Sequence, residues 1–90
     1  MSTSWQLEWH GGGEAWVVET DGTRATLHST RQAAVGTPLS AAVADKPGVT
    51  LRFKVKDCRR VEDGLFVLVG RWVDLSRALR EELVQEVGLR

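Results

Sequence analysis

The sequence predicts a mostly β fold, a small six-stranded antiparallel β-barrel with one C-terminal α-helix. Three observations support this prediction. Apolar and polar residues alternate over most of the chain up to residue 73, which is typical of half-buried strands. Turns that contain glycine or proline separate the alternating runs. After residue 74 the apolar spacing becomes that of a helix. Short strands followed by one amphipathic helix favour a barrel that the helix covers in part.

The first three strands are predicted from the N-terminal third of the chain. SWQLEW places Trp5, Leu7 and Trp9 on one face of a strand. HGGG breaks this strand, EAWVVET forms the second, and TRATLHS forms the third. Between the last two lies Asp21-Gly22, a pair that favours a type I′ hairpin turn with positive φ at both residues.

Three further strands and the helix complete the prediction. The fourth strand begins near Pro38, VTLRFKVKDCRRV is the fifth, and LFVLVGRWV is the sixth. Asp74 or Ser76 is expected to cap the helix. One apolar helix stripe contains Leu75, Leu79, Leu83 and Val87. We expect this stripe to pack on the barrel; without such a surface it would form a homodimer.

Length and composition favour one globular domain. We expect a single domain over residues 1–90, with the barrel over 4–73 and the helix over 75–87. Twelve acidic and twelve basic residues cancel, so net charge points neither to nucleic acid nor to membranes. A single cysteine, Cys58, excludes an internal disulfide and fits a reducing compartment. Without a signal-peptide pattern or a long apolar run, we expect a cytoplasmic protein that does not insert into a membrane.

Two stretches resemble the PilZ domain family. AAVGTPLSAAV is similar to the entry of a PilZ strand. LRFKVKDCRRVEDGLFVLVGRWVDLSRALREEL is similar to the remainder, in which the last strand ends in an aromatic residue, then Asp-Leu-Ser, then a helix. The resemblance covers roughly residues 15–87. It implies a bacterial six-stranded barrel with a C-terminal helix, in agreement with the pattern of strands.

The resemblance also implies where a ligand would bind. Many PilZ domains bind cyclic di-GMP through an Arg-x-x-x-Arg pair ahead of the first strand and an Asp/Asn-x-Ser-x-x-Gly turn. Here no arginine precedes Arg24, and the turn motif falls on residues 19–24. Glu19 stands for Asp/Asn, Asp21 for Ser and Arg24 for Gly, with Gly22 between them. Because two carboxylates would repel a dianionic ligand, we expect a degenerate ligand turn and the loss of ordinary cyclic di-GMP binding.

PilZ members without these motifs act through protein contacts, often in motility or around type IV pili. The resemblance therefore implies a non-catalytic adaptor or signalling domain with an unknown protein partner. Two alternatives remain open: a cyclic di-GMP receptor with a non-standard site, and a barrel that binds nucleic acid. An enzyme is not expected, because nothing in the sequence fixes Asp21, His28 and Ser29 as a catalytic set. No metal site or cofactor is predicted.

Two groups of residues are candidates for partner binding. Trp5, Trp9 and Trp16 lie in the first hairpin, where they are either core residues or exposed anchors. Arg52, Lys54 and Lys56 project from one side of the fifth strand, with Arg59, Arg60 and Arg71 near in sequence or across the hairpin. This basic stripe is a solvated face, protection of a sheet edge, a surface for an acidic protein, or a track for nucleic-acid phosphates.

Overall fold

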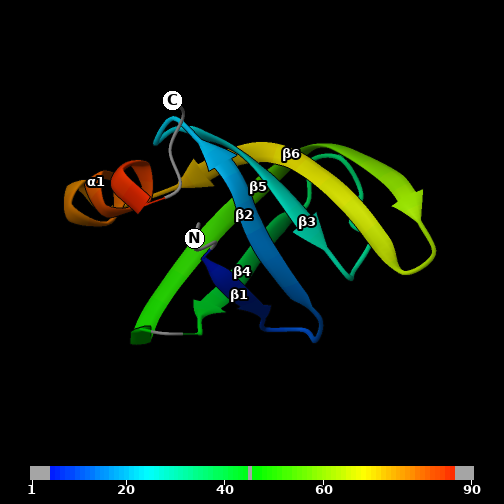
Figure 1. Cartoon of the computed structure of the whole chain (residues 1–90), viewed down its shortest axis with the longest axis horizontal. Coiled ribbons are helices and arrows are strands. Elements are labelled where there is room, and N and C mark those ends of the chain that lie inside the picture. Colours follow the sequence, from blue (N-terminus) through cyan, green and yellow to red (C-terminus); the bar gives the residue numbers. More distant parts are fainter. Residues whose placement is uncertain (1–4, 45, 87–90) are drawn as a thin grey trace.

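The computed structural model describes residues 5–44 and 46–86, which form a closed antiparallel barrel and one helix (Figure 1). The strands are β1 (Gln6–Trp9), β2 (Glu14–Thr20), β3 (Arg24–Ser29), β4 (Pro38–Val43), β5 (Lys46–Glu62) and β6 (Leu65–Val73), and the helix is α1 (Arg77–Glu86). They are ordered β1-β2-β3-β6-β5-β4 around the barrel, and the pairing of β1 with β4 closes it. The predicted fold class is confirmed.

Alternation along the strands fills the barrel interior. Inward residues of every strand meet in one core, because successive side chains point to opposite faces of a sheet. The largest fully buried members are Phe53, Leu7, Leu27, Leu51, Leu68, Leu83, Val17 and Val55. The rings of Phe53 and Trp72 pack edge to face at a centroid distance of 5.3 Å. Gly70 leaves room for this packing, since a Cβ there would lie 2.8 Å from Phe53 Cζ and 2.1 Å from the Lys54 carbonyl oxygen.

Three of the four tryptophans belong to this core. Trp5, Trp9 and Trp72 are only 5%, 4% and 7% exposed. The indole N–H of Trp9 donates to Ser29 Oγ at 3.0 Å, and that of Trp72 donates to Thr20 Oγ1 at 3.1 Å. The hypothesis that Trp5 and Trp9 are exposed partner-binding anchors is therefore wrong, because the shared face of their strand points inward.

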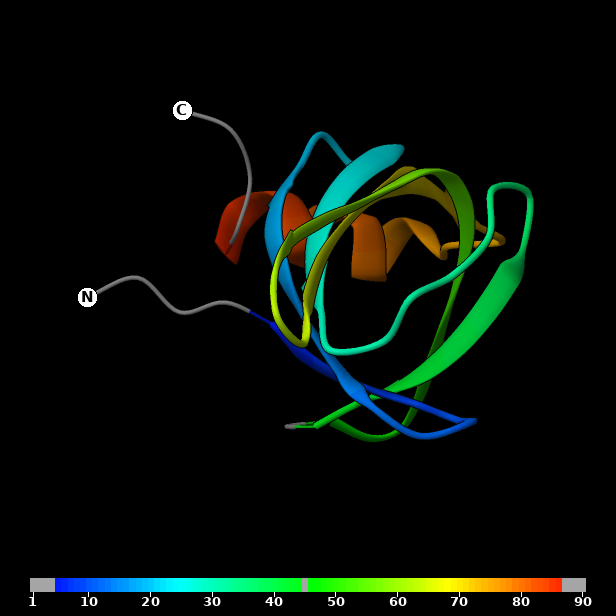
Figure 2. The ribbon, with the colours of Figure 1, turned by 90° about the vertical axis from the view of Figure 1, so that its right-hand side faces the viewer.

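Helix α1 lies across one end of the barrel, opposite the tip of the β5–β6 hairpin (Figures 1 and 2). It begins at Arg77, two residues after the predicted start at 75, because Ser76 is its cap. The Ser76 hydroxyl accepts a hydrogen bond from the Leu79 N–H at 3.2 Å. Asp74, the other predicted cap, instead has a positive φ of 55° in the connection from β6.

The apolar stripe at α1 faces the barrel. Leu83 is fully buried in the core, and Leu75 and Leu79 pack against that core. Lys46 Nζ lies 2.9 Å from Glu82 Oε2, which ties the helix to the start of β5. The expectation that the stripe packs on the barrel is therefore confirmed for Leu75, Leu79 and Leu83. Val87 lies outside the described residues.

Strand β5 is longer than its neighbour β4. Pairing with β4 ends at Lys54. The next residue, Val55, bonds to the loop before β4: its N–H donates to the Thr37 carbonyl oxygen, and its carbonyl oxygen accepts from the Gly36 N–H. From residue 56 to 62, β5 pairs with β6 alone among the described residues. Within the same described residues, no helix is long and apolar enough to cross a membrane.

Candidate binding surface

The β2–β3 turn, at the predicted degenerate ligand turn, is built by the Asp21 side chain. Asp21 Oδ1 accepts hydrogen bonds from the N–H groups of Thr23 and Arg24, both at 2.8 Å. These bonds, that of Arg24 foremost, lower the pKa of the Asp21 carboxyl below its ordinary value of 3.8. Gly22 has a φ of +93°, whereas Asp21 does not have a positive φ. The predicted type I′ turn is therefore wrong: three residues connect the strands, and the Asp21 carboxylate holds their N–H groups.

The Thr20 hydroxyl at the end of β2 is saturated by structural hydrogen bonds. It donates to the Arg24 carbonyl oxygen at 2.7 Å. It accepts from the Gly22 N–H at 3.0 Å and from the Trp72 indole N–H at 3.1 Å. Thr20 is 2% exposed. Its hydroxyl therefore joins the turn to the end of β6 and presents nothing to a ligand.

Gly22 is where helix α1 approaches the turn. A Cβ on Gly22 would lie 2.7 Å from Arg80 Cγ and 3.2 Å from Val84 Cγ2. Gly22 is buried although it is in a hairpin turn. The glycine is required twice, for its positive φ and for the space that the helix occupies. One side of the predicted ligand turn is therefore covered by α1.

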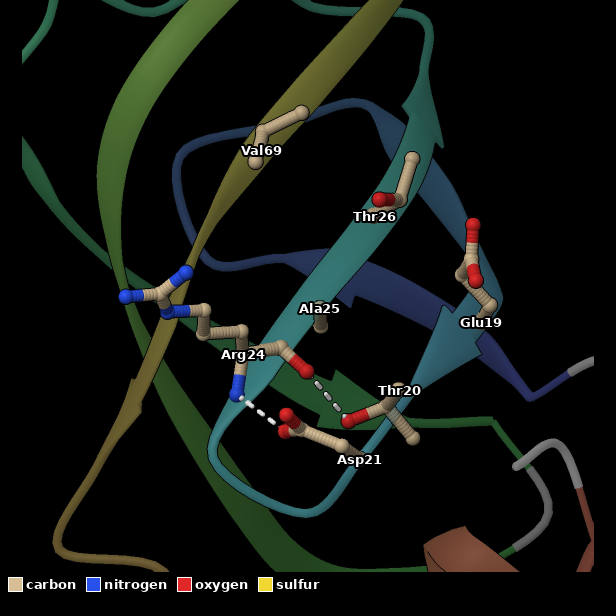
Figure 3. Close-up of a pocket in the computed structure, with 7 residues that line it drawn as sticks. All are labelled: Glu19, Thr20, Asp21, Arg24, Ala25, Thr26 and Val69. Carbon is tan, nitrogen blue, oxygen red and sulfur yellow. Dashed lines mark hydrogen bonds between the residues drawn. The ribbon is translucent and has the colours of Figure 1, made fainter. Parts of the chain in front are cut away.

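The other side of the turn opens onto a shallow depression on the outside of the barrel (Figure 3). Its volume is about 250 Å³, and its lining consists of Glu19, Thr20, Asp21, Arg24, Ala25, Thr26 and Val69. A bulge in β2 between Val17 and Glu19 leaves both Val18 and Glu19 exposed. Figure 3 shows the Arg24 side chain directed away from Glu19, so that the two charges flank the depression. Three of the four predicted turn residues thus line it, and Gly22 does not.

Three cations form a line across the strands next to this depression. Arg24 on β3 is paired with Arg71 on β6, and Arg71 is paired with Lys54 on β5. Directly paired residues project from the same face with Cβ atoms about 5 Å apart. All three side chains are exposed, and none forms an ion pair with a described residue. We call Arg24, Arg71 and Lys54 the basic row.

The chain matches no protein-family model, no curated protein and no solved structure.

The other two residues of the predicted basic stripe lie on either side of Lys54. Arg52 is within 3.8 Å of Asp74, so its charge is partly balanced. Lys56 lies where the β5–β6 register shifts between Val55 and Asp57. Arg52 and Lys54 are paired with residues of both β4 and β6. Edge protection therefore does not explain these two, because they are not on an edge.

Sequence reasoning missed Thr26, Val69 and the alignment of Arg24 with Arg71. The alternation within β3 was sufficient to place Thr26 outward. Arg24 and Arg71 are 47 positions apart in the chain, and no local pattern reports their pairing.

The residues considered for catalysis are separated. His28 and Ser29 are at the opposite end of β3 from Asp21. Ser29 Oγ is buried, accepting from Trp9 and from the Arg31 N–H and donating to the Arg31 carbonyl. His28 pairs across the outer face with half-buried Trp16 on β2. Of the three tryptophans predicted as possible partner-binding anchors, Trp5 and Trp9 are buried and Trp16 keeps a solvent-accessible surface.

Proposed function

We propose that the chain is a non-catalytic, PilZ-like adaptor domain that acts through contacts with a protein partner and does not bind cyclic di-GMP in the ordinary way. The observation that carries this proposal is the state of the β2–β3 turn. The Asp21 carboxylate and the Thr20 hydroxyl are engaged by the turn itself, and helix α1 lies against Gly22. A turn with these contacts supports the barrel and leaves few groups for a nucleotide.

Electrostatics on the open side of the turn also support the proposal. Glu19 and Asp21 both line the depression. The Asp21 carboxylate is charged at neutral pH, and the backbone hydrogen bonds that lower its pKa favour this charged form. Two negative charges in a site oppose a ligand that carries two phosphates. By the same resemblance, the proposed setting is the bacterial cytoplasm, in regulation of motility or pili.

One observation favours a second function, that of a cyclic di-GMP receptor with a non-standard site. Arg24 lines the depression and is paired with Arg71 on the neighbouring strand. Two adjacent guanidinium groups can form forked hydrogen bonds with a phosphate. If this function is correct, nucleotide binding depends on these two arginines and not on an Arg-x-x-x-Arg pair.

Isothermal titration calorimetry with cyclic di-GMP separates the two functions. We expect no saturable heat at nucleotide concentrations that saturate a PilZ domain carrying both motifs, which serves as the positive control. A dissociation constant of about 10 µM or tighter would contradict the proposal. Loss of that binding in Arg24→Ser, with binding retained in Arg77→Ser, would then establish the non-standard receptor. Arg77 is a suitable control because it is an exposed arginine on α1.

A further inference from the structure

We propose that the basic row of Arg24, Arg71 and Lys54 is the docking site for an acidic, extended segment of the protein partner. This inference rests on the proposed adaptor function and names the surface and the chemistry through which it acts. The three side chains come from three different strands and reach the same outer face through the β3–β6 and β5–β6 pairings.

The basic row places like charges directly opposite each other on neighbouring strands. Like charges directly opposite each other in an antiparallel pair destabilise a sheet. Here two such pairs are consecutive, Arg24 with Arg71 and Arg71 with Lys54. The charge of Arg24 interacts with the nearby Asp21 carboxylate, whereas Arg71 and Lys54 have no ion-pair partner among the described residues. Carboxylates from another molecule would remove this repulsion.

The dimensions of the row fit a short run of carboxylates. Neighbouring strands are about 4.8 Å apart, so three strands place the outer two cations about 10 Å apart. Side chains on one side of an extended peptide repeat about every 7 Å. Two acidic residues at positions i and i+2 of an extended segment would therefore cover the row. Each guanidinium can donate two parallel hydrogen bonds to one carboxylate.

The depression next to the row provides an apolar contact for the same segment. Val69 is 36% exposed, and it lies two residues from Arg71 on β6, on the same outer face. Thr26 and Ala25 also line the depression, together with the carboxylates of Glu19 and Asp21, so the acidic residues of the segment would lie over the row and not in the depression. A small apolar side chain beside the acidic residues could bury surface here, whereas charge contacts at an exposed rim alone contribute little affinity.

The surroundings of the row favour an acidic peptide over nucleic acid. The next line of paired residues runs Glu19, Thr26, Val69 and Asp57, with a carboxylate at each end. These carboxylates interrupt a continuous phosphate track, whereas a short segment with two acidic residues would contact only the row. The net charge of the chain is zero, and the half-buried Trp16 is not in the row or beside it. Single-strand binders combine a basic groove with exposed aromatic residues, and that combination is missing from the described part of this face.

An NMR titration of ¹⁵N-labelled protein tests the inference. The probe is an eight-residue peptide of alternating glutamate and valine, with a glutamine-valine peptide as the neutral control. We expect the amide shifts of Arg24, Arg71 and Lys54 to move with saturation below about 1 mM. Arg71→Ser should weaken binding at least fivefold, and Arg77→Ser should leave it within twofold. Arg71→Ser should also raise the melting temperature by about 1–5 °C, because it removes both like-charge pairs.

Every other outcome overturns the inference. These outcomes are the absence of saturable shifts, equal binding of the glutamine peptide, equal weakening by Arg77→Ser, and tighter binding of an eight-nucleotide oligothymidine than of the acidic peptide. None of them bears on cyclic di-GMP. The calorimetric test above can thus fail or succeed separately, and the proposed function and the docking site are distinguished.

Discussion

At the scale of single residues, two buried hydroxyl groups organise the ends of the barrel. Thr20 and Ser29 accept the indole N–H groups of Trp72 and Trp9, respectively. Both hydroxyl-bearing residues are at most 2% exposed. A buried N–H group that is left without an acceptor destabilises the fold by its full desolvation free energy. Loss of either hydroxyl should therefore lower stability more than the small volume of the group suggests.

Replacement of Thr20 by valine keeps the shape of the side chain and removes its hydroxyl. The N–H groups of Gly22 and Trp72 would lose their acceptor. We expect Thr20→Val to lower the free energy of unfolding by about 2–4 kcal/mol, measured by urea denaturation. Thr20→Ser, the matched control, should lose no more than about 1 kcal/mol. Equal stability of the valine and serine variants would show that the hydroxyl is not needed.

The Asp21 carboxylate should make stability depend on acid pH. Its pKa is lower in the folded state, because it accepts hydrogen bonds from the Arg24 and Thr23 N–H groups. The stabilisation is complete above the unfolded pKa and is lost as pH falls through the folded pKa. In Asp21→Asn, we expect a smaller decrease in the free energy of unfolding from about pH 5 to pH 2. Glu8→Gln removes an exposed carboxylate from β1 and serves as the control. Parallel pH profiles for Asp21→Asn and the native chain would contradict this expectation.

At the scale of elements, helix α1 is held to the barrel mainly through one side chain that enters the core. Leu83 is fully buried, and Lys46 and Glu82 add an ion pair that is partly exposed. A helix of ten residues is marginal in water without such packing. The helix, in turn, covers Gly22, so its docking and the shape of the β2–β3 turn depend on each other.

Truncation of Leu83 should therefore destabilise the whole domain. We expect Leu83→Ala to lower the free energy of unfolding by about 2–4 kcal/mol in a single cooperative transition. Gln85→Ala, an exposed position on the same helix, should change it by no more than about 0.5 kcal/mol. Light scattering should give a monomer for both variants. A dimeric native chain that Leu83→Ala makes monomeric would instead assign the stripe to self-association.

The same elements show what could be predicted from the sequence. Six strands and the helix were predictable because apolar spacing reports which face of each element is buried. The type I′ turn was predicted wrongly because the Asp-Gly pair does not reveal the hydrogen bonds of the Asp21 carboxylate or the helix over Gly22. The basic row was visible only in part. Lys54 and Arg71 belong to one hairpin, whereas Arg24 joins them through a long-range pairing.

At the scale of the whole molecule, the burial of the tryptophans shows which faces of the strands line the barrel interior. The sequence placed Trp5 and Trp9 on one face of a strand, but alternation alone does not say whether that face points inward. In the structure Trp5, Trp9 and Trp72 are buried and Trp16 is half-buried. Closure of the barrel decides this, because it gives the shared face a common core.

Iodide quenching should therefore detect Trp16 alone. We expect a minor quenchable fraction of the native fluorescence, and Trp16→Phe should abolish that fraction. Urea-unfolded protein, in which all four indoles are accessible, gives the upper limit of quenching. Substantial quenching that persists in folded Trp16→Phe would mean that one of the other three tryptophans is accessible.

Because β5 extends beyond the end of β4, its two parts differ in the number of strands that pair with them. From residue 56 to 62, β5 is held from one side only among the described residues. Segments with fewer partners open at a lower free energy than the global unfolding reaction and exchange their amide hydrogens first. The hairpin tip is therefore the place where local opening and proteolytic cleavage should begin. Arg71 and Lys54 are each paired on both sides, and Arg24 is held by its pairing with Arg71 and by the Asp21 carboxylate. The backbone positions that carry the three cations are therefore set by the barrel before any partner arrives.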